Sequence, residues 1–467
     1  MTAISASTQR VFAVWWKDLE RWAIPTNLIL RQSLPKGWER VRIGALVRQV
    51  DKRVKAEPEN VYKMAGVRLY GKGVFHRETV RGDAMSANQV TPLVVGALIY
   101  NRLFAWKATF AVVTPEYGDC YVSSEFPQFV PDAERILSEY LYLFCTRETT
   151  VRAVNAASTG SSAVSRNRFK EEEFLRFEIS LPPLAEQRTV VTRWRKAQDE
   201  IAAARERVLK LEAKLPLIVY QELGTPPPLA EKTTEKYLVM WWKDLDRWSF
   251  NYLSRANQGL LGFAKSKFPI KPLGDHLIET MNGYCIKPVA GPTPHKMLKL
   301  NALDPAGLNL TASKFIIIPD RIAERFSIRK DDLFICRSVG SYDHVAKCAL
   351  ATEDVASTVF PDIMIRVRFS NSLLPAFVRE VVQTPLGRSF FQSNARTAVG
   401  MWKIGAEDIA NFPIPVPPLP VQQQVVERLA AARKEIARER EAADRLDREI
   451  NAEIEALILG TKKVSKL

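Results

Sequence analysis

A duplicated segment constrains this chain more than any other feature of its sequence. The first copy spans residues 177–224 and begins FEISLPPLAEQ; the second spans residues 412–460 and begins FPIPVPPLPVQ. Each copy has a short apolar run, a Pro-Pro-Leu stop and then a long stretch with helical periodicity. Because two consecutive prolines fix φ and remove backbone donors, a helix can begin only after them. The sequence therefore predicts two long helices, each preceded by the same signal.

Both long stretches carry the heptad seam of a coiled coil, with seam positions at alternating steps of three and four. A lone amphipathic helix would be ordinary core, but two matched seams predict helices that pair with each other. Pro216 predicts a kink or an early end in the first helix. The first seam comprises Trp194, Ala197, Ile201, Ala204, Val208, Leu211, Leu215 and Ile218. The second comprises Leu429, Ala432, Ile436, the charged exception Glu439, Ala443, Leu446, Ile450, Ile454 and Leu457.

The repeat extends over the whole chain. WWKDLERW at 15–22 returns as WWKDLDRW at 241–248, LIYNR at 98–102 matches LFICR at 333–337, and LGT at 223–225 matches LGT at 459–461. The sequence is a tandem duplication of one unit. Strands are expected in TFAVV, CYVSSEFPQFV, FIIIP and DIMIRVRF. We therefore predict an α+β fold with a pseudo-two-fold internal repeat, in which the two long helices pair as an antiparallel coiled coil.

The repeat also predicts the domain boundaries. In chain order they are a Trp-rich helical segment at 1–34, a globular domain at 35–180, a long helix at 181–224, a Pro-rich linker at 225–236, a second Trp-rich segment at 237–265, a second globular domain at 266–415, a second long helix at 416–460 and a basic tail at 461–467.

The charge distribution favours a polyanion ligand. The chain carries a net charge of +15, whereas the long helices carry +2 and −2, so the excess lies on the other segments. This fits DNA or RNA binding, and the alternative on charge alone is a basic protein that is merely soluble. No apolar run is long enough to span a membrane, and the N-terminus lacks a signal-peptide core. The five cysteines form no CxxC pair, which indicates reduced thiols and a cytoplasmic protein without a zinc site.

The sequence lacks the motifs of the common nucleic-acid enzymes. It has no GxGxxG or GxxxxGK[ST] loop, no DPPY or NPPY tetrapeptide for amino-methylation, and no HExxH among its four histidines. We therefore expect no catalytic residue, no metal and no cofactor. Antiparallel helices of roughly 30 to 40 residues would span about 45 to 60 Å, one to two turns of B-DNA at ~34 Å each. Two different domains on such a spacer predict a bipartite, asymmetric DNA target.

The duplicated motif resembles that of a known family, the specificity (S, or HsdS) subunits of Type I restriction-modification systems, which defend cells against foreign DNA. The resemblance covers nearly the whole chain and depends on LPPLAEQ at 181–187 and VPPLPVQ at 416–422, each followed by a long helix. The second copy departs from the first at Pro420 and Val421. The resemblance implies that each globular domain is a target-recognition domain reading double-stranded DNA. It also implies that two methyltransferase subunits dock on the helices, that restriction subunits join them, and that this chain is not an enzyme.

Residues that contact DNA are expected among polar and basic side chains in turn-rich stretches. Arg and Asn suit base contacts, while Lys and Ser more often bind phosphate. Arg102 and Arg337 occupy matching positions, which favours a shared framework or phosphate role. The candidates are Arg102, Lys107, Ser162, Arg166 and Arg168 in the first domain, and Arg337, Ser341, Tyr342, Asn394, Arg396 and Lys403 in the second.

Two other functions remain open from the sequence. One is a nuclease or methyltransferase with diverged motifs, which would bind S-adenosylmethionine or cut DNA with Mg²⁺. The other is a scaffold that uses its coiled coil only for protein partners, which would show no salt-dependent DNA binding.

Overall fold

The computed structural model describes residues 34–85, 88–158, 168–228, 263, 265–304, 307–398 and 400–464. The chain forms two compact units, the first made of Met1–Ala203 with Ala442–Leu467 and the second of Ala204–Glu441. The boundary between the units falls inside both long helices. The two Trp-rich repeats at 15–22 and 241–248 lie outside the described residues.

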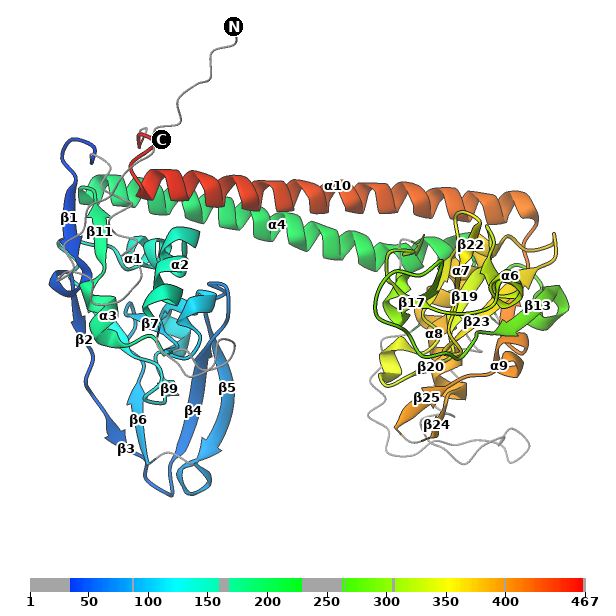
Figure 1. Cartoon of the computed structure of the whole chain (residues 1–467), viewed down its shortest axis with the longest axis horizontal. Helices are drawn as coiled ribbons and strands as arrows, with labels where there is room; N and C mark the ends of the chain where they lie inside the picture. The colour runs from blue at the N-terminus through cyan, green and yellow to red at the C-terminus, as the bar shows by residue number, and fades with distance from the viewer. Residues whose placement is uncertain are drawn as a thin grey trace, which may run out of the picture. The chain divides into compact units, whose positions relative to one another are not determined.

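The first unit is built on a small antiparallel sheet covered by helices (Figure 1). Its four strands follow the order β2-β10-β7-β8 and are Val47–Gln49, Gln128–Pro131, Leu98–Tyr100 and Phe110–Val112. A ribbon of β1 (Glu39–Arg42) and β11 (Glu178–Leu181) leads into the first long helix. The helices are α1 (Ser138–Thr146), α2 (Glu148–Ala157) and α3 (Glu171–Arg176).

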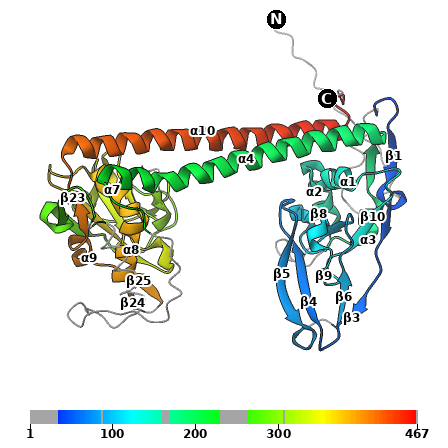
Figure 2. The same cartoon turned by 180° about the vertical axis from the view of Figure 1, so that it is seen from behind.

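A second sheet is inserted between β2 and β10 of the first unit (Figure 2). It is five-stranded, in the order β3-β6-β9-β4-β5, with strands Val54–Lys55, Gln89–Pro92, Tyr121–Val122, Val61–Val67 and Val74–Arg81. The core of the unit lies between the four-stranded sheet and the helices, where the ring of Tyr100 packs against Phe110 and Phe174. All three residues of β7 are fully buried, as a central strand between two layers requires.

The second unit repeats this plan. Its four-stranded sheet has the order β13-β23-β19-β21, with strands Leu277–Asn282, Met364–Phe369, Leu333–Cys336 and Cys348–Leu350. The ribbon is formed by β12 (Ile270–Pro272) and β26 (Pro413–Pro415). The helices that correspond to α1, α2 and α3 are α7 (Pro375–Gln383), α8 (Pro385–Asn394) and α9 (Ala406–Ala410). Strand order and direction agree between the units, so the predicted internal repeat is confirmed.

The insertions differ between the units. The second unit has a four-stranded sheet in the order β17-β14-β22-β18, with strands Ser313–Ile316, His295–Leu298, Val355–Val359 and Ser327–Ile328. Helix α6 (Asp320–Arg325) lies beside this sheet. It also has the hairpin of β15 (Leu303–Asp304) and β16 (Gly307–Leu308). A three-stranded sheet has the order β20-β25-β24, with strands Ser338–Val339, Met401–Lys403 and Arg396–Ala398. The two units therefore share a framework and carry different additions.

The expected strands are present in both units. TFAVV contains β8, CYVSSEFPQFV contains β9 and most of β10, FIIIP contributes the end of β17, and DIMIRVRF contains β23. These runs combine β-branched and aromatic residues with flanking turn residues, the pattern that fits a buried, pleated surface.

The two long helices are α4 (Leu184–Leu223) and α10 (Leu419–Ile458), each of 40 residues. Both begin directly after the Pro-Pro pair and are followed by a glycine in the left-handed conformation, Gly224 at φ 63° and Gly460 at φ 70°. Figures 1 and 2 show them side by side within each unit. The ion pairs run in opposite chain directions: Arg193 with Glu453 in the first unit, and Arg207 with Glu439 in the second. The predicted antiparallel coiled coil is therefore present.

Of the two outcomes predicted at Pro216, the early end of the first helix is wrong, while a kink there stays a prediction. The helix continues through Pro216 to Leu223. Proline removes one backbone donor and costs about 3 kcal/mol in a helix interior. The residues after it offset this cost, because Val219, Tyr220 and Leu223 are buried in the core of the second unit. The hydroxyl of Tyr220 also accepts a hydrogen bond from the backbone N–H of Leu386 at 3.2 Å.

Candidate nucleic-acid interface and helix anchors

A buried glutamine fastens the first long helix to its domain. Gln187, the last residue of LPPLAEQ, has no exposed surface. Its Oε1 accepts from the backbone N–H of Leu137 at 2.9 Å, just before α1. Its Nε2 donates to the carbonyls of Arg135 and Pro182, each at 2.9 Å. One side chain thus joins the Pro-Pro turn, the long helix and the start of α1.

The same junction is repeated in the second unit. Gln422, the last residue of VPPLPVQ, is also fully buried. Its Oε1 accepts from Leu374 N–H at 2.8 Å, and its Nε2 donates to the carbonyls of Ser372 at 3.0 Å and Pro417 at 2.8 Å. Buried amides cost free energy unless their groups are paired, and here both donors and the acceptor oxygen are used. The sequence interpretation did not single out these glutamines, although their shared place in both motifs was a usable signal.

An ion pair is a second interaction that holds the long helix α10 to its domain in the second unit. Glu380 of α7 is 4% exposed and accepts two hydrogen bonds from Arg433 of α10, both at 2.6 Å. Burial alone would raise the pKa of Glu380, but the hydrogen bond from Arg433 and the charges of Arg379 and Arg433 outweigh it and lower that pKa. The carboxylate therefore stays ionised and holds α7 against α10.

The described seam residues differ in burial. Ile201, Val208, Leu429, Ile436, Ile450 and Ile454 are buried, whereas Trp194, Leu211, Leu215 and Leu446 are half-buried. Glu439, the charged exception, is half-buried and binds Arg207 at 2.9 Å from the partner helix. An acidic seam position is tolerated there because a cation from the other helix compensates it.

Two of the six second-domain candidates lie on one small sheet. Arg396 and Lys403 are both exposed and lie directly opposite each other in the pairing of β24 with β25. Ser341 is also exposed and lies just before the short 3-10 helix η10 (Tyr342–His344), two residues after β20 of this sheet. Figures 1 and 2 show β24 and β25 on the side of this unit away from α4 and α10.

The Arg396–Lys403 pair is unfavourable without a ligand. Like charges directly opposite across an antiparallel pair destabilise it, and no carboxylate in the described part of the chain forms an ion pair with either residue. A bound polyanion would remove this repulsion. This is the strongest electrostatic indication of a nucleic-acid surface in the second unit.

Two other second-domain candidates serve the fold. The hydroxyl of Tyr342 donates to the carbonyl of Gln392 at 3.0 Å, and its ring packs edge-on against Trp402 at 4.7 Å between centroids. Asn394 donates to the carbonyl of Phe390 at 2.9 Å, one helical turn earlier in α8. Tyr342 therefore joins η10 to α8 and β25, whereas the hydrogen bond from Asn394 to Phe390 stays within α8.

The first-domain candidates are more strongly paired. Arg102 forms an ion pair with Glu171, and Arg168 forms one with Glu125 at 2.5 Å, though Arg168 stays exposed. Lys107, in the 3-10 helix η5 (Ala105–Lys107), lies over the ring of Trp106, 4.7 Å from its centroid. Ser162 and Arg166 lie outside the described residues. The carboxylates of Glu171 and Glu125 therefore compensate the positive charges of Arg102 and Arg168.

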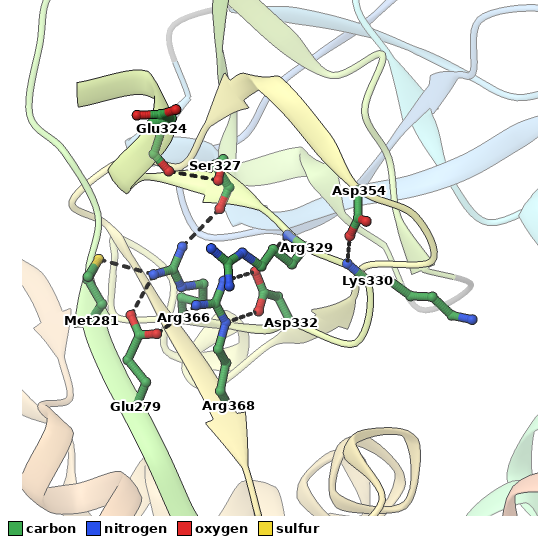
Figure 3. A network of polar contacts seen from close by, with 10 residues as sticks. All are labelled: Glu279, Met281, Glu324, Ser327, Arg329, Lys330, Asp332, Asp354, Arg366 and Arg368. Atoms are coloured by element: carbon green, nitrogen blue, oxygen red, sulfur yellow. Dashed lines mark hydrogen bonds and ion pairs between the residues drawn. The ribbon is translucent and has the colours of Figure 1, made fainter. Parts of the chain in front are cut away.

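A charge network holds the main sheet of the second unit (Figure 3). Arg366, which is 2% exposed, donates to Glu279 at 2.5 Å, and Arg368 donates to the same carboxylate at 2.7 Å and to Asp332 at 2.5 Å. Burial favours a higher pKa for Glu279, yet the hydrogen bonds and charges of the two arginines hold its pKa below the ordinary value. The network joins β13, β23 and the turn before β19. It is structural, and the sequence interpretation missed it because its members are far apart in the chain.

Neither a metal site nor a membrane span is found in the residues that the structure describes. No cluster of three or more His, Cys, Asp or Glu side chains there could hold a metal ion. No helix among those residues is long and apolar enough to cross a bilayer.

Known proteins share features of this sequence. A family model described as the Type I restriction modification DNA specificity domain matches residues 98–211, from β7 into α4. The specificity subunit of the Type I restriction enzyme EcoKI from Escherichia coli (strain K12) is 22% identical over 276 residues, which are 59% of this chain and 54% of that protein. The chain thus matches about half the length of this relative.

Solved structures share the fold. A chain from a structure described as "Structural basis underlying complex assembly and conformational transition of the type I R-M system" aligns with a TM-score of 0.58 and 15% identity, over 91% of this chain and 99% of that chain. The HsdS subunit from Thermoanaerobacter tengcongensis aligns over 92% of this chain and 99% of its own at 16% identity, with a lower TM-score of 0.42. In the matched domain and in its similarity to the EcoKI subunit, the chain resembles the specificity subunits of Type I restriction-modification systems.

Proposed function

We propose that this chain is the DNA-recognition subunit of a Type I restriction-modification complex. The observation that carries the proposal is the repeated framework with unlike insertions, a five-stranded sheet in one unit and a four-stranded sheet with a β20-β25-β24 sheet in the other. A shared framework suits a common docking task, whereas unlike insertions suit two different half-sites. The target would then be bipartite and asymmetric double-stranded DNA.

The proposed DNA surface of the second domain includes Arg396, Lys403 and Ser341. Two exposed cations facing the same side of a hairpin suit phosphate binding, and Arg396 also has the geometry for a guanine edge. Tyr342 supports this region by joining η10 to α8 and to Trp402 of β25. In the first domain we propose Lys107 and Arg168, with Ser162 and Arg166 nearby in sequence.

The paired helices are proposed as the spacer and as the docking site for two methyltransferase subunits, through which restriction subunits would join. Forty residues at ~1.5 Å per residue give about 60 Å, between one and two turns of B-DNA. Leu209 and Leu217 of α4 support a docking surface, since they are 64% and 46% exposed and two turns apart. In this proposal the chain performs no chemistry itself and works in the cytoplasm, where its DNA target lies.

A map of adenine methylation in source cells with and without this gene tests the proposal. We expect one split motif with a fixed gap to lose methylation on deletion. Exchange of residues 266–415 for the second domain of another specificity subunit should then change one half of the motif and leave the gap unchanged. If deletion removes no motif while the partner methyltransferase is expressed and active, the proposal is wrong.

A further inference from the structure

Arg102 and Arg337 occupy equivalent positions in the two units. Each follows the third strand in order of its four-stranded sheet, β7 or β19. The carbonyl of Arg102 accepts from the N–H of Phe169 at 3.0 Å, and that of Arg337 accepts from the N–H of Ile404, also at 3.0 Å. Their backbones therefore perform the same task, which is to hold the segment that leads into α3 or α9.

Their side chains differ because one acidic residue is present in one unit only. Glu171, the first residue of α3, pairs with Arg102, and both side chains are largely buried, with exposed fractions of 23% for the arginine and 18% for the glutamate. The first residue of α9 is Ala406, which cannot pair with Arg337. Arg337 instead donates to the carbonyl of Asp362 at 3.2 Å. Glu171 thus neutralises the charge of Arg102, whereas no carboxylate among the described residues forms an ion pair with Arg337.

The surroundings of Arg337 are also cationic. Its neighbour Ser338 pairs with Lys403, and Lys403 pairs with Arg396, so these residues belong to one three-stranded sheet. Within the described parts of the chain, no carboxylate forms an ion pair with Arg337, Arg396 or Lys403. Lys403 and Arg396 lie opposite each other, and Arg337 directly precedes β20 of the same sheet, so this region has a raised positive potential that favours an anionic ligand.

We infer that the shared arginine has separate roles in the two domains: Arg337 binds a DNA phosphate, whereas Arg102 is a positioning residue that latches α3 through Glu171. This inference depends on the proposed DNA-recognition function and adds that the two domains contribute unequally to phosphate binding. Because Ala406 stands where the first unit has Glu171, the guanidinium of Arg337 can donate hydrogen bonds to a phosphate oxygen.

The test uses two matched variants of the full-length chain, Arg337→Gln and Arg102→Gln. Glutamine keeps the backbone carbonyl bond and one side-chain donor while removing the charge. Binding to a fluorescein-labelled DNA duplex of mixed sequence is measured by anisotropy over a range of KCl concentrations. Each phosphate contact contributes about 0.9 to the slope of log K against log salt. We expect Arg337→Gln to reduce the magnitude of this slope by about 0.9 and Arg102→Gln to leave it unchanged.

A second measurement tests the ion pair between Arg102 and Glu171. Arg102→Gln should speed amide hydrogen exchange over residues 168–176, and Arg337→Lys should keep the wild-type slope because it keeps the charge. Equal slope losses in both glutamine variants, or no loss in Arg337→Gln, would overturn the inference. If the wild-type chain shows no salt-dependent DNA binding either alone or with its methyltransferase, the proposed function itself fails, which is a distinguishable result.

Discussion

Replacement of Gln422 by methionine tests the helix anchor most directly. Methionine has a similar length but offers no strong donor or acceptor, so three backbone groups lose their partner. Ser372 is exposed and water can satisfy its carbonyl, whereas Pro417 is buried and Leu374 is half-buried. Two groups left unpaired at about 1–2 kcal/mol each give a total cost near 3 kcal/mol.

The chain offers a matched control next to the anchor. Gln423 is exposed and donates only to Glu427, at 2.9 Å on the helix surface. Gln423→Met should therefore change stability by less than about 0.5 kcal/mol. Both substitutions lie in the same turn of α10, so a difference in helix propensity cannot explain a difference between them.

Native-state hydrogen exchange read by mass spectrometry over residues 370–384 is the assay. A cost of 3 kcal/mol should speed exchange at protected amides of α7 by about a hundredfold, since 1.4 kcal/mol corresponds to tenfold. Urea denaturation gives an independent value. Equal exchange rates in Gln422→Met and Gln423→Met would refute the anchor role, because the three bonds would then contribute nothing measurable.

Three further predictions concern charge and backbone. Glu380→Gln leaves Arg433 without its carboxylate and should lower the free energy of unfolding by about 3 kcal/mol, measured by urea denaturation at pH 7. Because folding lowers the pKa of Glu380, the stability that its ionised form contributes is present above the ordinary pKa of 4.5 and is lost as the pH falls through the lower folded pKa. The free energies of unfolding of wild type and variant should therefore converge in acid. Pro216→Ala restores a helix N–H and should stabilise the second unit by about 1–3 kcal/mol, seen as a higher melting temperature. An unchanged or lower melting temperature would contradict this prediction. Arg396→Glu pairs with Lys403 and should stabilise the hairpin by about 0.2–1 kcal/mol while weakening DNA binding, and unchanged binding by anisotropy would remove Arg396 from the interface.

Local patterns were sufficient for the architecture. The Pro-Pro-Leu stops fixed where α4 and α10 begin, the heptads indicated their pairing, and the repeated segments predicted that both domains share a framework. These features follow from backbone restriction and side-chain period, which depend on near neighbours. Pro216 is the exception, since its local signal was outweighed by the burial of Tyr220 and Leu223.

The candidate site was only partly predictable. Arg396 and Lys403 were chosen as basic residues in turn-rich stretches, but nothing local showed that they face each other across a hairpin. No local pattern indicated that Glu171 would pair with Arg102 while no described carboxylate pairs with Arg337. Such facts require the positions of residues that are distant in the chain.

The amino-acid sequence by itself determined the tandem repeat, the two long helices and their antiparallel pairing, because helix stops and hydrophobic periods act over a few residues. Tertiary structure alone decided which polar groups meet, including the three backbone partners of Gln187 and of Gln422, the Arg366 network and the unpaired charge of Arg337. Each of these depends on strand and helix packing that joins segments tens of residues apart, and the free energy of a buried polar group is set by the partners that this packing supplies.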